Sequence, residues 1–363
     1  MKHKIGFIGL GLIGGSIAKA IRQYYPDYEI VAFDKSKESL ALATQESTID
    51  VAATTIDNNF HNCNYIFLCA PVASNTAYLK QITEYLNDDC ILTDVGSVKT
   101  NIHEEVKALG IEKYFIGGHP MAGSEKSGYS NSKAMLIENA YYILTPTSEV
   151  SQEKVDAYEH FIESLKALPI VLDYQLHDYI TGTISHLPHI IASSLVNFVK
   201  QHDTNDELMK NLAAGGFKDI TRIASSSPIM WQNICLKNKQ NIVDILDQYI
   251  DSLEDFKEAI EREDDLDLYN RFDSSRNYRN SMPASSAGPI KKAFAVYCDI
   301  IDEAGGIAAI ATILASNNIS IKNIGIIHNR EFEEGVLRID FYDEDSTKGA
   351  VELLQKFRYI VYE

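Results

Sequence analysis

Residues 4–34 read KIGFIGLGLIGGSIAKAIRQYYPDYEIVAFD, and this stretch decides the fold of the first part of the chain. The apolar run Lys4–Gly9 predicts a strand, and the residues after it, up to Tyr24, have the spacing of a helix. Ile30–Asp34 predicts the next strand. The glycines at the first strand-to-helix turn follow the pattern GxGxxG, and the acidic Asp34 comes about 20 positions later, as in the dinucleotide-binding fingerprint.

Each glycine of this pattern has a physical reason. Gly9 permits the tight turn, Gly11 lets the backbone approach a pyrophosphate, and Gly14 lets helix and strand pack closely. The helix N-terminus, with Leu12 and Ile13 in its first turn, offers unpaired N–H groups and a positive dipole to the phosphates. The alternative, a glycine turn in a fold that binds no nucleotide, does not account for the complete strand–turn–helix–strand context.

Asp34 predicts which dinucleotide is preferred. A carboxylate there accepts hydrogen bonds from the ribose hydroxyls and repels a 2′-phosphate, which favours NAD over NADP. Lys35 and Lys37 weaken that preference slightly. Ala70 and Pro71, at the end of the apolar run NYIFLCAP (Asn64–Pro71), are also assigned to the cofactor site.

The first 172 residues predict an α/β Rossmann domain. Apolar runs at Asn64–Pro71, Cys90–Val95, Tyr141–Thr145 and Ile170–Leu172 alternate with amphipathic segments, which is typical of a parallel sheet covered on both faces.

Residues 173–281 predict an all-α domain, because apolar residues recur there at steps of three and four. Its longest stripe suits either an internal bundle or a dimer interface, and its members are Ile242, Ile245, Tyr249, Leu253, Phe256 and Ile260. Residues 282–291 predict a linker, since MPASSAGP breaks every periodicity. Residues 292–363 have a β-α-β-β-α-β rhythm, which is typical of a ferredoxin-like α+β domain.

Composition narrows the classes of partner. The 363 residues carry 51 acidic and 33 basic side chains, a formal charge of −18, so nucleic acid and anionic membranes are poor partners. An anionic ligand needs locally concentrated positive charge. The five cysteines contain no CxxC pair, which argues against a disulfide framework and a metal site. No stretch is long enough to span a membrane, and we expect a cytoplasmic protein.

Three further segments carry polar groups that a core does not need. They are DVGSVK (Asp94–Lys99), GGHPMAGSE (Gly117–Glu125), and the pair SHLPH (Ser185–His189) and GGFKDITRIA (Gly215–Ala224). Each has a plainer interpretation, because a loop histidine is often structural, a helical arginine is often solvated, and histidines beside a proline can cap a helix. Their coincidence with a strong dinucleotide site favours a chemical role.

Together with GLGLIGGS (Gly9–Ser16), these segments resemble the prephenate dehydrogenase family over nearly the whole chain. The resemblance implies NAD-dependent oxidative decarboxylation of prephenate to 4-hydroxyphenylpyruvate, in a homodimer whose helical domain dimerises. It implies that His119 is the base on the ring hydroxyl and that Ser97 holds the same hydroxyl. Arg222 then clamps a carboxylate, and the remaining substrate residues are His189, Ser185, Lys218, Gly215, Glu125 and Ser124. Trp231 packs either over the pocket or in the core.

The tail resembles an ACT domain, a small ligand-sensing unit, although Ala304 replaces the usual proline of its loop motif. The resemblance implies that tyrosine binds there and inhibits, with Asp302, Gly305 and Asn318 as regulatory residues; the alternative is a unit that only dimerises or has lost its ligand. Other functions remain open: an arogenate or cyclohexadienyl dehydrogenase, a β-hydroxyacid dehydrogenase, or a non-catalytic sensor of NAD and an amino acid.

Overall fold

The computed structural model describes residues 3–123, 126–282, 294–300, 305–327 and 335–362. The chain divides into two compact units, residues 1–288 and 289–363, and each is described by itself. The first unit contains both the predicted Rossmann and the predicted helical region. The linker expected at 282–291 lies outside the described residues except for Met282.

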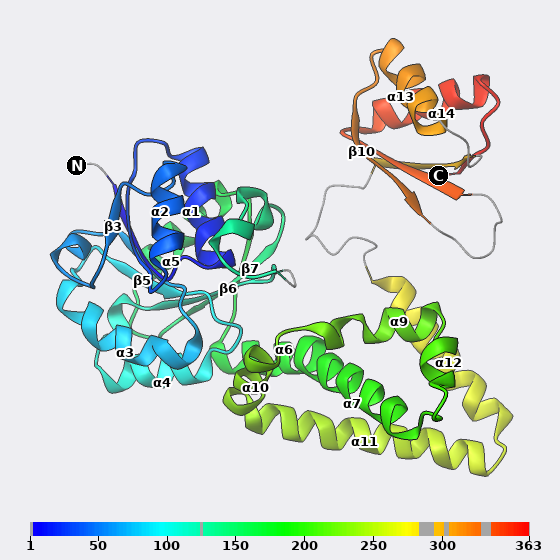
Figure 1. The fold of residues 1–363 in the computed structure, drawn as a ribbon, viewed down its shortest axis with the longest axis horizontal. Coiled ribbons are helices and arrows are strands. Elements are labelled where there is room, and N and C mark those ends of the chain that lie inside the picture. The colour runs from blue at the N-terminus through cyan, green and yellow to red at the C-terminus, as the bar shows by residue number, and fades with distance from the viewer. Residues whose placement is uncertain (1–2, 124–125, 283–293, 301–304, 328–334, 363) are drawn as a thin grey trace. The chain divides into compact units, whose positions relative to one another are not determined.

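A five-stranded parallel sheet, in the order β3-β2-β1-β4-β5, forms the centre of the N-terminal part of the first unit (Figure 1). Its strands are β1 (Lys4–Ile8), β2 (Glu29–Phe33), β3 (Val51–Ala53), β4 (Tyr65–Leu68) and β5 (Ile91–Asp94). Such an order, which reverses beside β1, is that of the doubly wound fold, and ligands bind outside the carboxyl ends of its strands.

A three-stranded sheet, in the order β6-β7-β8, adjoins the first one through a parallel bridge between Leu92 and Phe115. Its strands are β6 (Ile116–Pro120), β7 (Tyr141–Pro146) and β8 (Leu168–Val171). β6 and β7 are antiparallel, so the expectation of a wholly parallel sheet is wrong at this pair. β6 was not expected as a strand, because its sequence IGGHP has two glycines and no apolar run.

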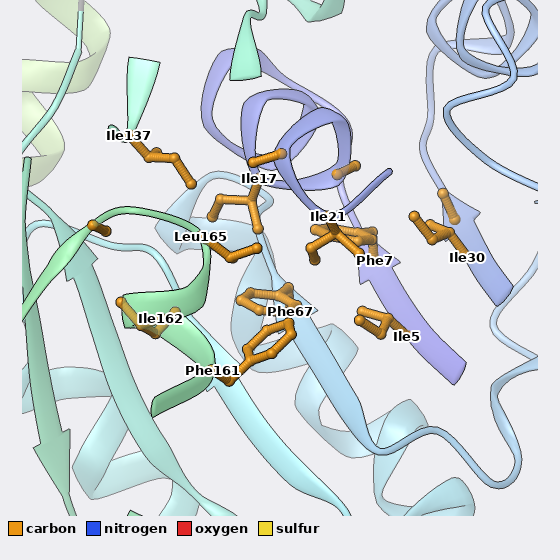
Figure 2. Packing of buried hydrophobic residues seen from close by; sticks show 14 of the residues in the cluster. Ile5, Phe7, Ile17, Ile21, Ile30, Phe67, Ile137, Phe161, Ile162 and Leu165 are labelled. Atoms are coloured by element: carbon orange, nitrogen blue, oxygen red, sulfur yellow. The ribbon is translucent and has the colours of Figure 1, made fainter. Parts of the chain in front are cut away.

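Helices cover both faces of the central sheet. They are α1 (Leu12–Tyr24), α2 (Lys37–Gln45), α3 (Val72–Ile82), α4 (Thr100–Ala108) and α5 (Gln152–Ser164). Figure 2 shows the packing on one face, where Ile17 and Ile21 of α1 meet Phe7 and Phe67 of the sheet, with Phe161 of α5 beside them. A second buried cluster joins α3 and α4 to the other face. The doubly covered sheet explains why the strands read as continuous apolar runs.

Short 3₁₀ turns link these elements. They are η1 (Asn58–Phe60), η2 (Thr83–Tyr85), η3 (Glu112–Tyr114), η4 (Tyr129–Asn131) and η5 (Ala134–Leu136). All five cysteines are free thiols.

The region after β8 is helical, as the sequence predicts. Its elements are α6 (Tyr174–Thr181), the π-helical segment η6 (Gly182–His186), α7 (Leu187–His202), α8 (Leu208–Leu212), α9 (Gly215–Thr221), the 3₁₀ turn η7 (Arg222–Ser225), α10 (Pro228–Lys237), α11 (Lys239–Glu261) and α12 (Asp265–Ser281). In Figure 1, α7 lies along the long α11, and contacts join the two. No helix in the described ranges is both long and apolar enough to cross a bilayer.

The apolar stripe of α11 divides into a buried and an exposed half. Ile242 and Ile245 are buried, whereas Leu253 is 51% exposed and Ile260 is 60% exposed. Large apolar side chains are exposed on the neighbouring helices as well, among them Phe198, Leu212, Ile229, Leu236 and Phe272. An apolar surface of this extent is unusual for a soluble monomer.

The second unit has the expected β-α-β-β-α-β order. Its elements are β9 (Phe294–Ile300), α13 (Gly306–Ser316), β10 (Ile321–Ile327), β11 (Gly335–Phe341), α14 (Glu344–Lys356) and β12 (Val361–Tyr362). The strands form an antiparallel sheet in the order β10-β11-β9-β12. Leu314 of α13 and Leu354 of α14 join Leu337 and Cys298 in a core of their own.

Candidate active site

The glycine turn between β1 and α1 is closely packed on one side and open on the other. Gly9 has φ = +103°, and a Cβ atom there would lie 2.7 Å from the amide nitrogen of Ala70. A Cβ atom on Gly14 would lie 2.5 Å from the carbonyl oxygen of Gly9. Around Gly11, by contrast, nothing lies within 4 Å of an added Cβ atom. The turn therefore excludes side chains where helix and strand meet and leaves space where a pyrophosphate would approach.

Asp34 follows β2 and is held beside this turn. Its two carboxylate oxygens accept hydrogen bonds from the backbone amides of Leu10 and Ser36, each at 2.6 Å. Leu12 and Ile13 form the first turn of α1, which has no side-chain cap on its N-terminus. Pro71 is the N-cap residue of α3, directly after Ala70. These residues fit a bound dinucleotide, because an uncapped helix N-terminus and a fixed carboxylate are the groups that phosphate and ribose require.

His119 lies on β6, at the edge of the sheet where the parallel strands end. His119 therefore lies in a strand and not in a loop. Its Nδ1 atom lies 2.8 Å from Nε2 of His177, on α6. Burial lowers the pKa of His119 well below its usual range, and His177, Lys99 and His186 add to that shift. A partly buried neutral imidazole is the form that can accept a proton.

Behind His119 lies a buried ion pair. The Nζ atom of Lys99 lies 2.6 Å from both carboxylate oxygens of Asp94 and 2.6 Å from the carbonyl oxygen of Gly118. Burial lowers the pKa of Lys99, although Asp94 opposes that shift. The pair ties the end of β5 to β6 one residue before His119. Ser97 lies in the loop between Asp94 and Lys99 and is partly buried.

His186, in the π-helical segment, is held by the side chain of Asn238. The amide nitrogen of Asn238 donates to the backbone oxygen of Asp178 at 2.8 Å and lies 3.0 Å from Nδ1 of His186. Nδ1 of His186 is thus an acceptor, and its Nε2 carries the proton. Burial lowers the pKa of His186 to about 4.

His189 and Trp231 form the next part of the site. Their rings stack with centroids 3.7 Å apart, and the Trp231 ring also meets His186 edge-on at 6.0 Å. His189 donates from Nδ1 to the backbone oxygen of Ser185 at 3.0 Å. Both rings line a groove of about 620 Å³ together with Phe198 and Cys235. Trp231 therefore packs over a groove rather than in a closed core.

Arg222 begins η7 and lies near enough to His189 for its charge to lower the pKa of that imidazole, in addition to the effect of burial. Lys218 and Gly215 lie on α9, which packs against α7, and Lys218 is exposed. Ser124 and Glu125 lie outside the described residues. His186 and His189 thus meet through Trp231, while the charge of His186 acts on His119 and that of Arg222 acts on His189.

Two residues of this site were missed by the sequence analysis. His177 and Asp178 are fully buried, and Nδ1 of His177 lies 2.8 Å from a carboxylate oxygen of Asp178. Their only sequence signal is a His-Asp pair inside an otherwise amphipathic helix. Nothing in the sequence brings that pair to His119, because the approach depends on how α6 packs against the sheet.

Comparison with known proteins gives the family. The model of the nucleotide-binding domain of prephenate dehydrogenase matches residues 17–171, and that of its dimerization domain matches residues 173–274. A prephenate dehydrogenase from Bacillus subtilis is 38% identical over 357 residues, which is 98% of this chain and 96% of that protein. A cyclohexadienyl dehydrogenase from Zymomonas mobilis is 30% identical over 77% of this chain and 95% of its own length.

A solved structure agrees with these matches. The prephenate dehydrogenase from Aquifex aeolicus, crystallised with hydroxyphenyl propionate and NAD⁺, superimposes with a TM-score of 0.73 at 32% identity. The match covers 78% of this chain and 99% of that one. The fold and the polar site define a dinucleotide-dependent oxidoreductase. The chain belongs to the prephenate dehydrogenase family.

Proposed function

We propose that this chain oxidises and decarboxylates prephenate to 4-hydroxyphenylpyruvate, with NAD as the hydride acceptor. The observation that supports this most directly is that His119, a neutral imidazole, and Arg222, a guanidinium, both lie next to the polar cluster of His186, Trp231 and His189. Prephenate carries a ring alcohol and two carboxylates. Its chemistry therefore requires one proton acceptor and at least one cation in the same site.

Each residue then has a defined task. His119 Nε2 accepts the proton of the ring hydroxyl, Ser97 holds that hydroxyl in line, and Arg222 binds a carboxylate through its planar fork. His189 and Ser185 line the adjoining wall, and Lys218, Gly215, Ser124 and Glu125 complete the substrate contacts. The residues that would hold NAD are Gly9, Gly11, Leu12, Ile13, Gly14, Asp34, Ala70 and Pro71, and NAD bound there would supply the hydride acceptor.

The reaction balances without any further reactant. The C–H bond of the carbinol carbon breaks, and its electron pair leaves as hydride. The C–C bond to the ring carboxylate breaks, its pair enters the ring, and carbon dioxide departs. The proton that His119 accepts returns to the phenol oxygen of the product. Because the ring becomes aromatic, positioning and one base are the main demands on the protein.

The test is the absorbance of NADH at 340 nm when the purified chain is mixed with prephenate and NAD. Arogenate is the second substrate, because a cyclohexadienyl dehydrogenase is among the relatives. We expect NADH from prephenate and a smaller kcat/KM with arogenate. Turnover of arogenate alone would assign the chain to the alternative, and no turnover of either would leave the non-catalytic sensor.

We infer that the chain works as a homodimer through its helical region. Support comes from the exposed apolar residues on α7, α10, α11 and α12 and from the name of the matched family domain. Sedimentation equilibrium is expected to give twice the monomer mass. Leu253→Glu should shift the chain toward monomer, while the exposed Lys257→Glu on the same helix should not. If the wild-type chain sedimented with the mass of a monomer, that result would contradict the inference.

We propose that the second unit is a ferredoxin-like ACT domain that binds tyrosine and inhibits the enzyme. Gly305 is the N-cap residue of α13 with φ = +96°, and Asn318 follows the same helix with φ = +58°. Asp302 lies outside the described residues. A chain truncated after Ala287 should keep its activity and lose inhibition by tyrosine, because the second unit has a core of its own. Unchanged inhibition would place the effector site elsewhere.

A further inference from the structure

His119, His177 and Asp178 form a line of hydrogen-bonding groups that the reaction described above does not use. Nδ1 of His119 lies 2.8 Å from Nε2 of His177, and Nδ1 of His177 lies 2.8 Å from Oδ1 of Asp178. The two rings meet nearly edge to face, with an interplanar angle of 71°. His177 and Asp178 are both fully buried, so neither contacts solvent.

Asp178 is fixed at the far end of this line. Its Oδ1 accepts from the backbone amide of Lys99 at 2.7 Å, and its Oδ2 accepts from the amide of Thr100 at 2.8 Å. Burial alone would raise the pKa of Asp178, but the hydrogen bonds from His177, Thr100 and Lys99 outweigh it and lower that pKa. Asp178 is therefore an ionised carboxylate, which can only accept hydrogen bonds.

The direction of every hydrogen bond in the line follows from that carboxylate. Nδ1 of His177 must carry a proton to donate to Asp178, which leaves Nε2 of a neutral His177 as an acceptor. Nδ1 of His119 must then be the donor. When both histidines are neutral, His119 therefore carries its proton on Nδ1, and its Nε2 is unprotonated.

We propose that His177 and Asp178 are positioning residues that hold His119 in the Nδ1–H tautomer, so that its Nε2 is ready to accept the substrate hydroxyl proton. This rests on the proposed function, in which His119 is that base. When Nε2 gains the proton, the new positive charge is shared along the hydrogen bond to His177 and faces the carboxylate of Asp178. A carboxylate behind a catalytic imidazole has this effect on other folds.

Other groups around His119 disfavour its protonated, positively charged form. Lys99 lies on the β5 side, and His186 lies on the helical side; both lower the pKa of His119. Within the described residues around the pair, Asp178 is the carboxylate that contacts the line directly, while Asp94 is occupied by Lys99. When His119 gains a proton, its positive charge is therefore balanced by the carboxylate of Asp178, through the hydrogen bonds of His177.

The decisive variant is Asp178→Asn. Its carboxamide has no negative charge to face the imidazolium. With its oxygen on the Thr100 amide, its nitrogen takes the place of Oδ1 and donates to Nδ1 of His177, which reverses the tautomer of His177 and then that of His119, so that Nε2 of His119 carries a proton. We expect kcat with prephenate to fall about 100-fold or more, while the KM values for prephenate and NAD change less than threefold. Histidine ¹⁵N NMR of the free enzyme is expected to show Nδ1–H at His119 in the wild type and Nε2–H in the variant.

His177→Gln separates positioning from packing. The glutamine oxygen can still accept from Nδ1 of His119, and its amide can still donate to Asp178, so the Nδ1–H tautomer should persist. We expect kcat to fall only about tenfold, with the low-pH limb of the kcat profile displaced, whereas His177→Leu should lose about 100-fold or more. His103→Gln, at a buried neutral histidine outside the line, is the matched control and should keep the wild-type kcat.

These results distinguish the inference from the proposed function. Wild-type kcat in Asp178→Asn, or an Nε2–H tautomer of His119 in the wild-type spectrum, would overturn the inference. Equal losses in His177→Gln and His177→Leu would also overturn it, because packing alone would then explain both. If the wild type showed the Nδ1–H tautomer but did not oxidise prephenate, the proposed function would fail and the tautomer assignment would stand.

Discussion

The Nζ atom of Lys99 and the carboxylate of Asp94 form an ion pair, 2.6 Å apart, whose side chains are 0% and 2% exposed. Breaking such a pair leaves an unpaired charge in the interior. We expect Lys99→Met to lower the free energy of unfolding by about 3–5 kcal/mol, measured as the urea midpoint of Trp231 fluorescence. Lys113→Met, which breaks an exposed pair with Asp88, should leave the urea midpoint nearly unchanged, because water and salt screen an exposed pair. Equal losses in the two variants would show that the buried pair is not a fixed part of the site.

His119→Asn removes the proposed base while keeping a polar side chain on β6. Turnover of prephenate should fall by about two to four powers of ten, the usual contribution of a positioned acid–base group. The dissociation constant for NAD, measured by calorimetry, should stay within a factor of two. The exposed His160→Asn is the control. A turnover near that of the wild type would exclude His119 from the reaction.

Arg222→Gln removes the guanidinium that we assign to a substrate carboxylate. A hydrogen bond to a charged group contributes about 1.5–3 kcal/mol, so KM for prephenate should rise about 10- to 100-fold. Because the role is binding, kcat should change less than KM. Arg262→Gln, at an exposed arginine after α11, should leave both constants unchanged. An unchanged KM in Arg222→Gln would move the carboxylate contact to another residue.

Asp34→Ala tests the preference for NAD. The variant loses both the acceptor for the ribose hydroxyls and the charge that repels a 2′-phosphate, so kcat/KM for NAD should fall about tenfold and the ratio to NADP should narrow. Asp27→Ala, at an exposed aspartate that precedes β2, is the control. If the NAD-to-NADP ratio stayed the same, Asp34 would act only through its bonds to Leu10 and Ser36.

Buried neutral histidines make the fold sensitive to acid. Burial lowers the pKa of both His103 and His186 to about 4. Above pH 6.5 these side chains are neutral in both states and have no effect; between pH 6.5 and 4 only the unfolded chain takes up their protons, so the free energy of unfolding falls. Each should contribute about 1.4 kcal/mol per pH unit. As the pH is lowered from 6.5 to 4, the urea midpoint should fall less steeply in His103→Gln than in the wild type. The same slope in both proteins would contradict the lowered pKa of His103.

The glycine turn and the place of Asp34 beside it could be predicted closely from the sequence because they depend on local geometry. The close approaches at Gly9 and Gly14 are encoded by glycines that stand a few residues apart, and Asp34 directly follows the next strand. The strand β6 could not be predicted in this way. Its residues Gly117 and Gly118 carry no apolar signal, and their extended conformation is imposed by pairing with β7.

The polar network behind His119 lay beyond sequence analysis for a different reason. His177 and His119 are separated by 58 positions, and their contact exists only after α6 has packed on the sheet. Asn238, which orients His186, comes from yet another helix boundary. Histidine and asparagine at these positions would also suit a helix face exposed to solvent. Only the burial and the hydrogen bonds of the folded chain distinguish a polar network from such a face.

The π-helical segment Gly182–His186 contains one residue more per turn than the helices on either side of it. An α-helix advances by about 100° with each residue, so four α-helical residues cover about the same rotation as the five residues of this wider turn. Deleting Thr183 would therefore let the helix continue regularly and leave the faces of α7 nearly unchanged. His189 would still meet Trp231, and the change would be confined to the segment that carries Ser185 and His186. The wide turn thus accommodates one more residue beside His186 without rotating the wall formed by the helix that follows it.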